Sequence, residues 1–149
     1  MPIVNRKRHL AAVLNPLAPS RRPTALLALC MKLCCWPVLD DEGEGKSSLY
    51  RLVKRFYSEV DSTEGLSVQV LQAAVCIALF EIGNAIYPAA YLTVGACARY
   101  GIAMSLDKIN KDRMGGDYHT ASWIEFEETR RVWWAILILD RYRSFPNCL

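Results

Sequence analysis

The stretch Val132-Trp-Trp-Ala-Ile-Leu-Ile-Leu139 decides the fold class, because eight consecutive apolar residues lie directly between charged ones. Arg130 and Arg131 precede this run, and Asp140 and Arg141 follow it. A helix that is apolar on every side is typically buried all round, unlike a surface helix with one apolar stripe. The pattern therefore predicts a last helix buried on all sides, with charged side chains at both ends.

The residues before this run carry a helix start signal. Ser122-Trp-Ile-Glu125 fits a capping box, in which the hydroxyl and the carboxylate each accept a hydrogen bond from an otherwise unpaired backbone N–H. Glu125, Glu127 and Glu128 near the start, with Arg141 near the end, complement the helix dipole. The sequence predicts that the last helix begins at Ser122.

Four earlier segments also combine helical spacing of apolar residues with recognisable start or stop signals. Pro37 ends the first helix, Ser67 begins the third, and Pro88 is a good first residue for the fourth. No segment alternates between apolar and polar residues as a strand does. The predicted helices span residues 24–36, 47 or 48 to 60, 67–82, 89 to about 105, and 122 onward. The sequence therefore predicts an all-α fold of about five helices.

Residues 1–22 differ in composition from the rest, with three of the seven prolines, five basic residues and no acidic residue. This composition predicts a disordered basic arm, followed by a domain over residues 23–149. Outside the arm, 13 basic and 15 acidic residues remain, a balance that gives no broad electrostatic footprint for a nucleic-acid backbone. Arg6-Lys7-Arg8 could serve nuclear import or nucleic-acid contact, but three basic residues more often form a solvated tail.

Membrane insertion and secretion are not expected. The longest apolar runs, residues 73–80 and 132–139, have eight residues each, whereas a spanning helix needs about 18 or more. The basic residues near the start are followed by only five apolar residues before Asn15 and Pro16, which is too few for a secretory signal. We therefore expect no membrane contact.

The six cysteines are expected to be free thiols that pack as small hydrophobes. A zinc site needs paired thiolates or imidazoles at short, regular spacing. The spacing Cys30-x3-Cys34-Cys35 has no second pair near it in the sequence. The sequence predicts no metal site and no cofactor. The cysteines are Cys30, Cys34, Cys35, Cys76, Cys97 and Cys148.

Catalytic residues are also not indicated. His9 lies in the predicted arm and His119 in a long polar loop, and no nucleophile is positioned beside either of them. The carboxylates of Glu127 and Glu128 lie four and three residues before Arg131, a spacing typical of a solvated ion-paired helix face. The sequence predicts a structural role for these groups.

One ion pair is expected to be buried. Asp140 directly follows eight apolar residues, and an unpaired buried carboxylate is costly. Arg99 stands among small and apolar residues of the fourth helix, so its guanidinium must either extend to solvent or find a carboxylate. Asp140 is the best candidate partner, with Glu127 and Glu128 as alternatives. The predicted polar network comprises Arg99, Glu127, Glu128, Arg130, Arg131, Asp140 and Arg141.

Five segments together resemble the fungal-specific transcription factor domain, the middle homology region of zinc-cluster regulators. They are Leu71-Gln-Ala73, Phe80-Glu81, Gly95-Ala-Cys-Ala-Arg-Tyr-Gly-Ile-Ala103, Glu127-Glu-Thr-Arg-Arg-Val-Trp-Trp134 and Leu139-Asp-Arg141. The acidic-Thr-Arg-Arg-x-Trp-Trp block running into Leu-Asp-Arg is the specific part. The resemblance is strong over residues 68–145, extends to Thr24, and does not cover the arm.

The resemblance implies a helical regulatory domain of a nuclear protein, which modulates a DNA-binding module and in some members responds to a small-molecule inducer. The family's DNA-binding zinc cluster, C-x2-C-x6-C, has no match here, so we expect no zinc and no direct nucleic-acid contact. The family pattern continues with further helices after Leu-Asp-Arg, so the chain is expected to be the N-terminal part of that domain.

The expected function is therefore a regulatory domain fragment of a transcription factor, acting in the nucleus. Its expected partners are a second copy, related transcription factors or a small-molecule inducer. One alternative is a truncated protein–protein interaction fragment without regulatory activity of its own. A small helical ligand-binding protein is another.

Overall fold

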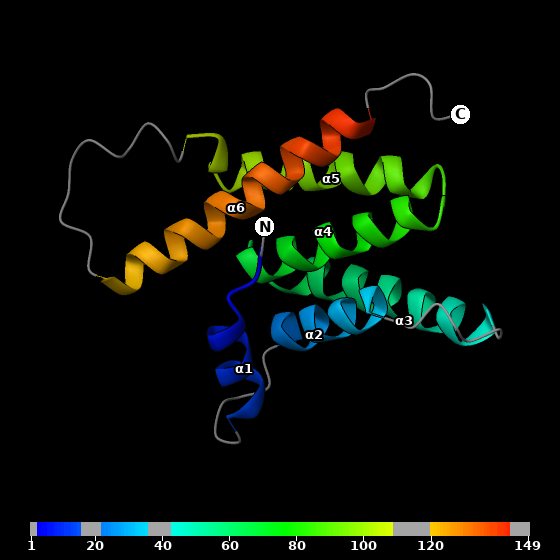
Figure 1. Ribbon diagram of the computed structural model, residues 1–149, viewed down its shortest axis with the longest axis horizontal. Helices are drawn as coiled ribbons and strands as arrows, with labels where there is room; N and C mark the ends of the chain where they lie inside the picture. The colour runs from blue at the N-terminus through cyan, green and yellow to red at the C-terminus, as the bar shows by residue number, and fades with distance from the viewer. Residues whose placement is uncertain (1–2, 16–21, 36–42, 109–119, 144–149) are drawn as a thin grey trace.

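The computed structural model describes residues 3–15, 22–35, 43–108 and 120–143, which form six α-helices and one 3₁₀ helix (Figure 1). The all-α prediction is confirmed. One helix more than the five predicted is present, and this additional helix, over residues 6–14, lies in the segment predicted to be a disordered arm. The elements are α1 (Arg6–Leu14), α2 (Arg22–Cys34), α3 (Gly43–Thr63), α4 (Val68–Gly83), α5 (Ala89–Ala103), η1 (Leu106–Lys108) and α6 (Thr120–Arg143).

The helix starts follow the sequence signals in part. Ser67 is the N-cap of α4, and its side chain accepts a hydrogen bond from the backbone N–H of Val70 at 3.3 Å, as predicted. Pro88 directly precedes α5. Ser122 lies inside α6, which begins at Thr120, so the predicted capping box is wrong as the start of this helix.

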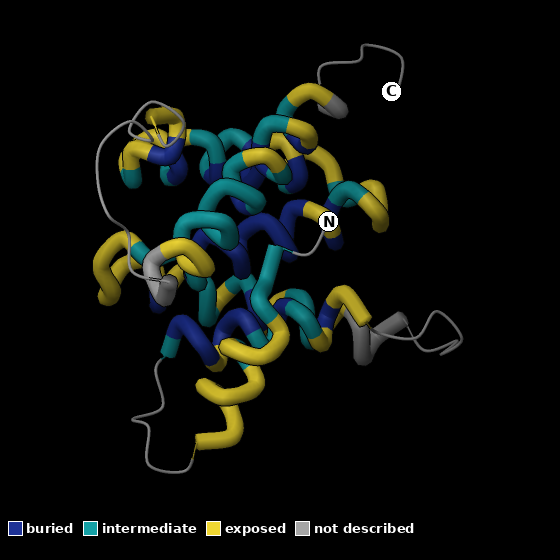
Figure 2. Tube along the Cα trace, turned by 60° about the vertical axis from the view of Figure 1, so that its left-hand side comes forward, coloured by how far each residue is buried: buried dark blue, intermediate teal, exposed yellow. Residues whose placement is uncertain are grey.

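Helix α4 lies at the centre of the molecule, between α2 and α3 on one side and α5 and α6 on the other (Figure 1). Its 16 residues are mostly apolar, and Figure 2 shows most of them buried. A helix without a polar face must be covered on more than one side. The two helix layers provide that cover.

Two hydrophobic clusters form the core, and α4 contributes to both. The first lies between α2, α3 and α4 and includes Leu26, Leu27, Cys30, Leu33, Val53, Val60, Val70, Ala73, Cys76, Ile77 and Phe80. The second lies between α4, α5 and α6 and includes Leu71, Ala74, Val75, Ala78, Val94, Cys97, Leu106, Val132, Ile136 and Leu139.

The prediction that α6 is buried on all sides is wrong. Val132 and Ile136 are fully buried and Leu139 is 8% exposed, whereas Trp134 is 46% and Ile138 is 61% exposed. The buried residues recur at helical spacing because the neighbouring helices cover one face of α6. This helix therefore has a buried stripe and an apolar exposed side.

Helices α5 and α6 approach each other closely at Gly101. A Cβ atom at this position would lie 2.8 Å from Cζ3 of Trp133 and 3.0 Å from Cε3. Because carbon atoms in contact are normally about 3.5–4.0 Å apart, only glycine fits beneath this indole ring. Gly101 thus permits the close packing of α5 on α6.

The N-terminal segment is folded against the rest of the chain along its described part. Asn5 caps α1, and its side chain accepts a hydrogen bond from the backbone N–H of Arg8 at 3.2 Å. Ile3 and Val4 are half-buried and pack against the first core cluster. The predicted disorder is therefore not seen for residues 3–15.

Over the residues described, no helix combines the length and apolar character that crossing a membrane requires.

Candidate functional site

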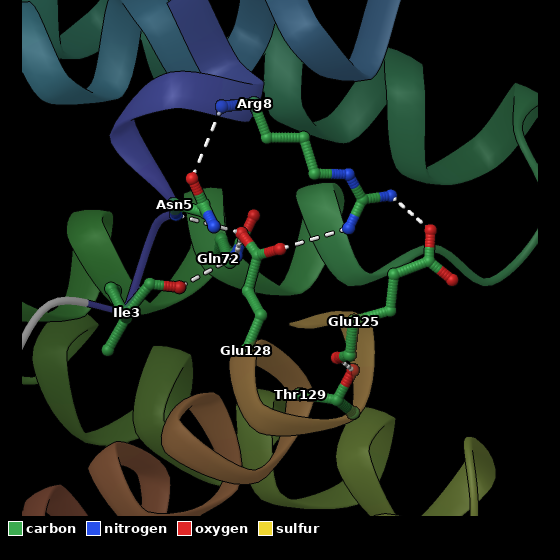
Figure 3. A network of polar contacts seen from close by, with 7 residues as sticks. All are labelled: Ile3, Asn5, Arg8, Gln72, Glu125, Glu128 and Thr129. Carbon is green, nitrogen blue, oxygen red and sulfur yellow. Dashed lines mark hydrogen bonds and ion pairs between the residues drawn. The ribbon is translucent and has the colours of Figure 1, made fainter. Parts of the chain in front are cut away.

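A polar contact network joins the N-terminal segment to α4 and to the start of α6 (Figure 3). We call this set the N-terminal junction; it comprises Ile3, Asn5, Arg8, Gln72, Glu125 and Glu128. The Glu128 carboxylate lies at its centre. Its Oε1 accepts hydrogen bonds from the Asn5 backbone N–H at 3.1 Å and from Nε2 of Gln72 at 2.8 Å. Its Oε2 accepts from Nη1 of Arg8 at 3.2 Å.

Arg8 and Gln72 complete the N-terminal junction. The Arg8 guanidinium also donates from Nη2 to Glu125 at 2.6 Å, so it bridges two carboxylates one turn apart on α6. The Gln72 amide, only 1% exposed, donates to the Ile3 carbonyl oxygen at 2.7 Å. These bonds satisfy the buried amide nitrogen and fix the N-terminal segment across α4.

A cleft of about 450 Å³ opens beside these contacts. This volume lies within the range of about 300–1,000 Å³ that small-molecule sites occupy. Its walls contain positively charged, negatively charged and neutral polar side chains together with a few apolar ones. This composition suits a polar organic molecule. Residues around it include Arg8, His9, Ser67, Gln69, Glu125 and Thr129.

A second polar group, the Glu81 cluster, lies between α3, α4 and α5 and comprises Tyr50, Lys54, Glu81 and Thr93. Oε1 of Glu81 accepts a hydrogen bond from the Tyr50 hydroxyl at 2.6 Å and from Nζ of Lys54 at 3.0 Å. Nζ of Lys54 also donates to Oγ1 of Thr93 at 3.3 Å. Glu81 is fully buried, and within the described ranges its Oε2 has no hydrogen-bond partner. Burial, and then the hydrogen bond to Glu81, raise the pKa of Tyr50.

The sequence reasoning missed this cluster. In the sequence, Glu81 stands out only as part of the Phe80-Glu81 pair that carries the resemblance. The signal in the sequence is a carboxylate inside the most apolar helix, where, as for Asp140, an unpaired buried charge would be costly. Its partners come from α3 and α5, and no local spacing connects them with Glu81.

The predicted polar network is only partly brought together. Glu127 accepts hydrogen bonds from Nε of Arg130 at 2.9 Å and from Nε of Arg131 at 3.0 Å. The bond from Arg131, followed by that from Arg130, lowers the pKa of Glu127. Glu128 contacts the N-terminal segment, through Arg8 and Asn5.

Of the two expected positions of Arg99, the structure has the solvent-exposed one and not the buried pair with Asp140. Arg99 is exposed, and among the ion pairs of the described residues none joins it to Asp140, which is half-buried on α6. The buried face of α5 contains Cys97 and Gly101, and a side chain two residues from each points elsewhere on a helix. Arg141 is also exposed.

The other candidate groups are scattered. His9 lies beside the cleft, while His119 and Cys148 are outside the described residues. Three cysteines are buried and two, Cys34 and Cys35, are exposed. Within the part of the chain that is described, no three His, Cys, Asp or Glu side chains gather so that they could hold a metal ion.

Comparisons with known proteins identify the family. Residues 2–145 match the fungal specific transcription factor domain. The chain is 37% identical over 131 residues to the transcription factor BOA15 of Botryotinia fuckeliana. The matched region covers 88% of this chain and 72% of that relative. It is 27% identical over 150 residues to the transcription factor tazR of Aspergillus terreus, and spans 23% of that relative's length. No solved structure matches.

The extent of the family match corrects one expectation. The resemblance was expected to exclude residues 1–22, but the match begins at residue 2. The contacts of Asn5 and Arg8 with α6 give a structural reason, because this segment packs on the block that carries the specific motif. The chain belongs to the fungal-specific transcription factor domain family.

Proposed function

We propose that this chain is a regulatory part of a nuclear transcription factor and that it does not itself contact DNA. The observation that carries the proposal is the N-terminal junction. Arg8, from the Arg6-Lys7-Arg8 stretch that could have served as a DNA-contacting arm, is engaged by Glu125 and Glu128. A guanidinium held by two carboxylates has little charge left to offer a phosphate backbone.

The charges on α6 support the same proposal. Arg130 and Arg131 both lie against Glu127. A DNA-reading helix needs uncompensated basic side chains beside the groove. In the specific motif of α6 the arginines are instead compensated within their own helix.

Two measurements test the proposal. Fluorescence anisotropy with a library of DNA duplexes at physiological salt should give no sequence-selective binding, and nanomolar, sequence-selective binding would contradict it. Fused to a heterologous DNA-binding domain, the full chain should change transcription of a reporter gene, whereas the same chain without that domain should not. A tethered chain without effect would remove the regulatory role.

A second candidate function is a protein–protein interaction module, through self-association or pairing with related transcription factors. The observation that favours it is the exposure of Trp134 and Ile138 on one side of α6. Large exposed apolar residues that share a face often mark association sites. Sedimentation analysis of the chain and its Ile138→Gln variant tests this candidate, which requires a concentration-dependent dimer that the variant weakens.

We also propose that the chain acts as the N-terminal part of a larger helical domain and that a small-molecule inducer acts on that domain. The chain spans 72% of the length of BOA15 and 23% of that of tazR, and the greater length of tazR supports the first point. The second is supported by the cleft at the N-terminal junction, with its size and mixed polarity. A screen of polar metabolites by thermal shift, repeated with Gln69→Ala at the cleft, tests whether a ligand binds there.

A further inference from the structure

Two cysteines from different helices lie against each other at the edge of the first core cluster. Cys34 is the last residue of α2 and is exposed, whereas Cys76 on α4 is buried. Sγ of Cys34 lies 3.4 Å from the backbone oxygen of Cys76. The Cys34 thiol donates this contact to the backbone of Cys76, and each of the two thiols shifts the pKa of the other.

We propose that Cys34 and Cys76 form a redox-sensitive pair, in which a peroxide oxidises the exposed Cys34 and the buried Cys76 then closes a disulfide between α2 and α4. Disulfides of proteins in reducing compartments are usually transient and redox-sensing. A pair with one exposed and one buried thiol fits such a role, because the oxidant reaches only the first sulfur.

The exposure of Cys34 and the burial of Cys76 assign the two roles, and the pKa shifts of the two thiols agree with that assignment. The hydrogen bond from the Cys76 thiol lowers the pKa of Cys34, against the opposing effect of partial burial. The same hydrogen bond and burial raise the pKa of Cys76. Since the thiolate is the nucleophile, Cys34 reacts first and Cys76 keeps its proton until the second step.

The two steps balance without a further reactant. In the first, the Cys34 thiolate attacks one oxygen of hydrogen peroxide; an S–O bond forms, the O–O bond breaks, and hydroxide leaves. Cys34 is oxidised to a sulfenic acid and the peroxide is reduced. In the second, the Cys76 sulfur attacks the Cys34 sulfur; the S–S bond forms, the S–O bond breaks, and the leaving hydroxide takes the Cys76 proton as water. A low-molecular-weight thiol reverses the reaction by exchange.

The neighbouring cysteines do not share this arrangement. Cys35 is also exposed, but it is the neighbouring Cys34 whose thiol contacts the backbone oxygen of Cys76. Cys30, one turn earlier on α2, is fully buried, and burial raises its pKa to about 12. Cys34 therefore combines access, activation and a buried partner. A disulfide would bring the two sulfur atoms to about 2.05 Å from each other.

The test is peptide mapping of the full chain after treatment with hydrogen peroxide and blocking of the remaining thiols. We expect a Cys34–Cys76 linked peptide that disappears on incubation with glutathione. Before oxidation, Cys34 should react with iodoacetamide faster than Cys35, about threefold for each unit by which its pKa is lower. Equal rates would contradict the assigned activation.

Variants distinguish the proposed pair from its neighbours. Cys34→Ser should abolish the link, whereas Cys35→Ser, an exposed neighbour, should leave it unchanged. Cys76→Ala should leave Cys34 as a sulfenic acid that dimedone traps, while Cys97→Ala, a buried control in the second cluster, should still form the link. The proposal is overturned if wild-type protein yields only a Cys34–Cys35 or Cys30–Cys34 bond, a link to Cys148, or cross-linked chains.

Discussion

The ammonium group of Lys54 on α3 lies 3.0 Å from the carboxylate of Glu81, whose side chain is fully buried on α4. Lys54 itself is 37% exposed at its side chain, so the pair reaches from the core to the surface. Burial makes the carboxylate depend on its partners, because an uncompensated charge in the interior is far more costly than one in water. The Glu81 cluster is therefore expected to be the most mutation-sensitive polar group described in this domain.

A double-mutant cycle tests this dependence. Lys54→Met should lower the free energy of unfolding by about 2–3 kcal/mol, below the usual range for a fully buried pair because water can reach the Lys54 end. Glu81→Gln should cost less, since it removes the charge and keeps an oxygen for the Tyr50 hydroxyl. The double variant should be more stable than Lys54→Met alone. Urea unfolding measures all three.

The control for this cycle is Arg55→Met, which removes an exposed positive charge one residue further along α3. It should change the free energy of unfolding by less than about 0.5 kcal/mol. Additive effects of the two substitutions at Lys54 and Glu81 would show that the two groups do not stabilise each other.

The close approach of α5 and α6 gives a prediction at Gly101. Gly101→Ala should destabilise the protein by about 1–3 kcal/mol, because the added methyl group displaces the Trp133 ring from the second core cluster. Gly83→Ala is the matched control, since no atom lies within 4 Å of the Cβ position there. It should be neutral, or stabilising by up to about 1 kcal/mol through helix propensity. Thermal unfolding distinguishes the two; equal effects would mean that the indole contact does not set the helix spacing.

The N-terminal junction predicts how firmly the first residues are held. Glu128→Gln should speed amide hydrogen exchange over residues 6–14 about two- to fivefold, because the contact with Arg8 is half exposed and such pairs contribute about 0.2–1 kcal/mol. Glu127→Gln makes the same charge change one residue earlier, where the partners are Arg130 and Arg131 of the same helix. It should leave this exchange unchanged, and an equal increase in both variants would contradict a specific role of Glu128.

The Glu127 carboxylate predicts an acid-linked effect. Its pKa is lowered first by the hydrogen bond from Arg131 and less by Arg130, so Arg131→Met should raise this pKa more than Arg130→Met does. A lowered pKa in the folded state stabilises the protein above the ordinary value of 4.5, and the contribution is lost as pH falls through the folded-state pKa. NMR titration of the glutamate carboxyl carbons measures both variants; equal shifts would rule out the stronger bond to Arg131.

The helices α4 and α5 and the family could be predicted from the sequence because their signals are local. Ser67 needs only its own helix to act as a cap, and the Glu127–Trp134 block is read directly along the chain. The burial of α6 could not be predicted in the same way. An apolar run such as residues 132–139 indicates which side chains could be buried. Which faces of the helix are covered depends on the number of neighbouring helices.

The polar contacts could not be predicted from the sequence for a related reason. The apolar neighbours of Arg99 in the sequence suggested a pair with Asp140. Whether Arg99 lies on the surface of α5, however, depends on which residues of that helix face α6. The N-terminal junction joins residues more than 110 positions apart, such as Arg8 and Glu125. Composition suggested disorder for that segment, and only the folded arrangement supplies the carboxylates that hold it.

The central position of α4 also has a consequence for synthesis on the ribosome. Helices α2 and α3 leave the exit tunnel before α4. The first core cluster, which they form together with α4, is therefore incomplete until α4 has also left the tunnel. At about 5–20 residues per second, the 16 residues of α4 take about one to three seconds to pass. During that interval the side chains of Leu26, Leu33 and Val53 remain open to water, and α4 in turn stays half-covered until α5 and α6 are made. A chaperone that binds short apolar segments would meet this nascent chain at two successive stages.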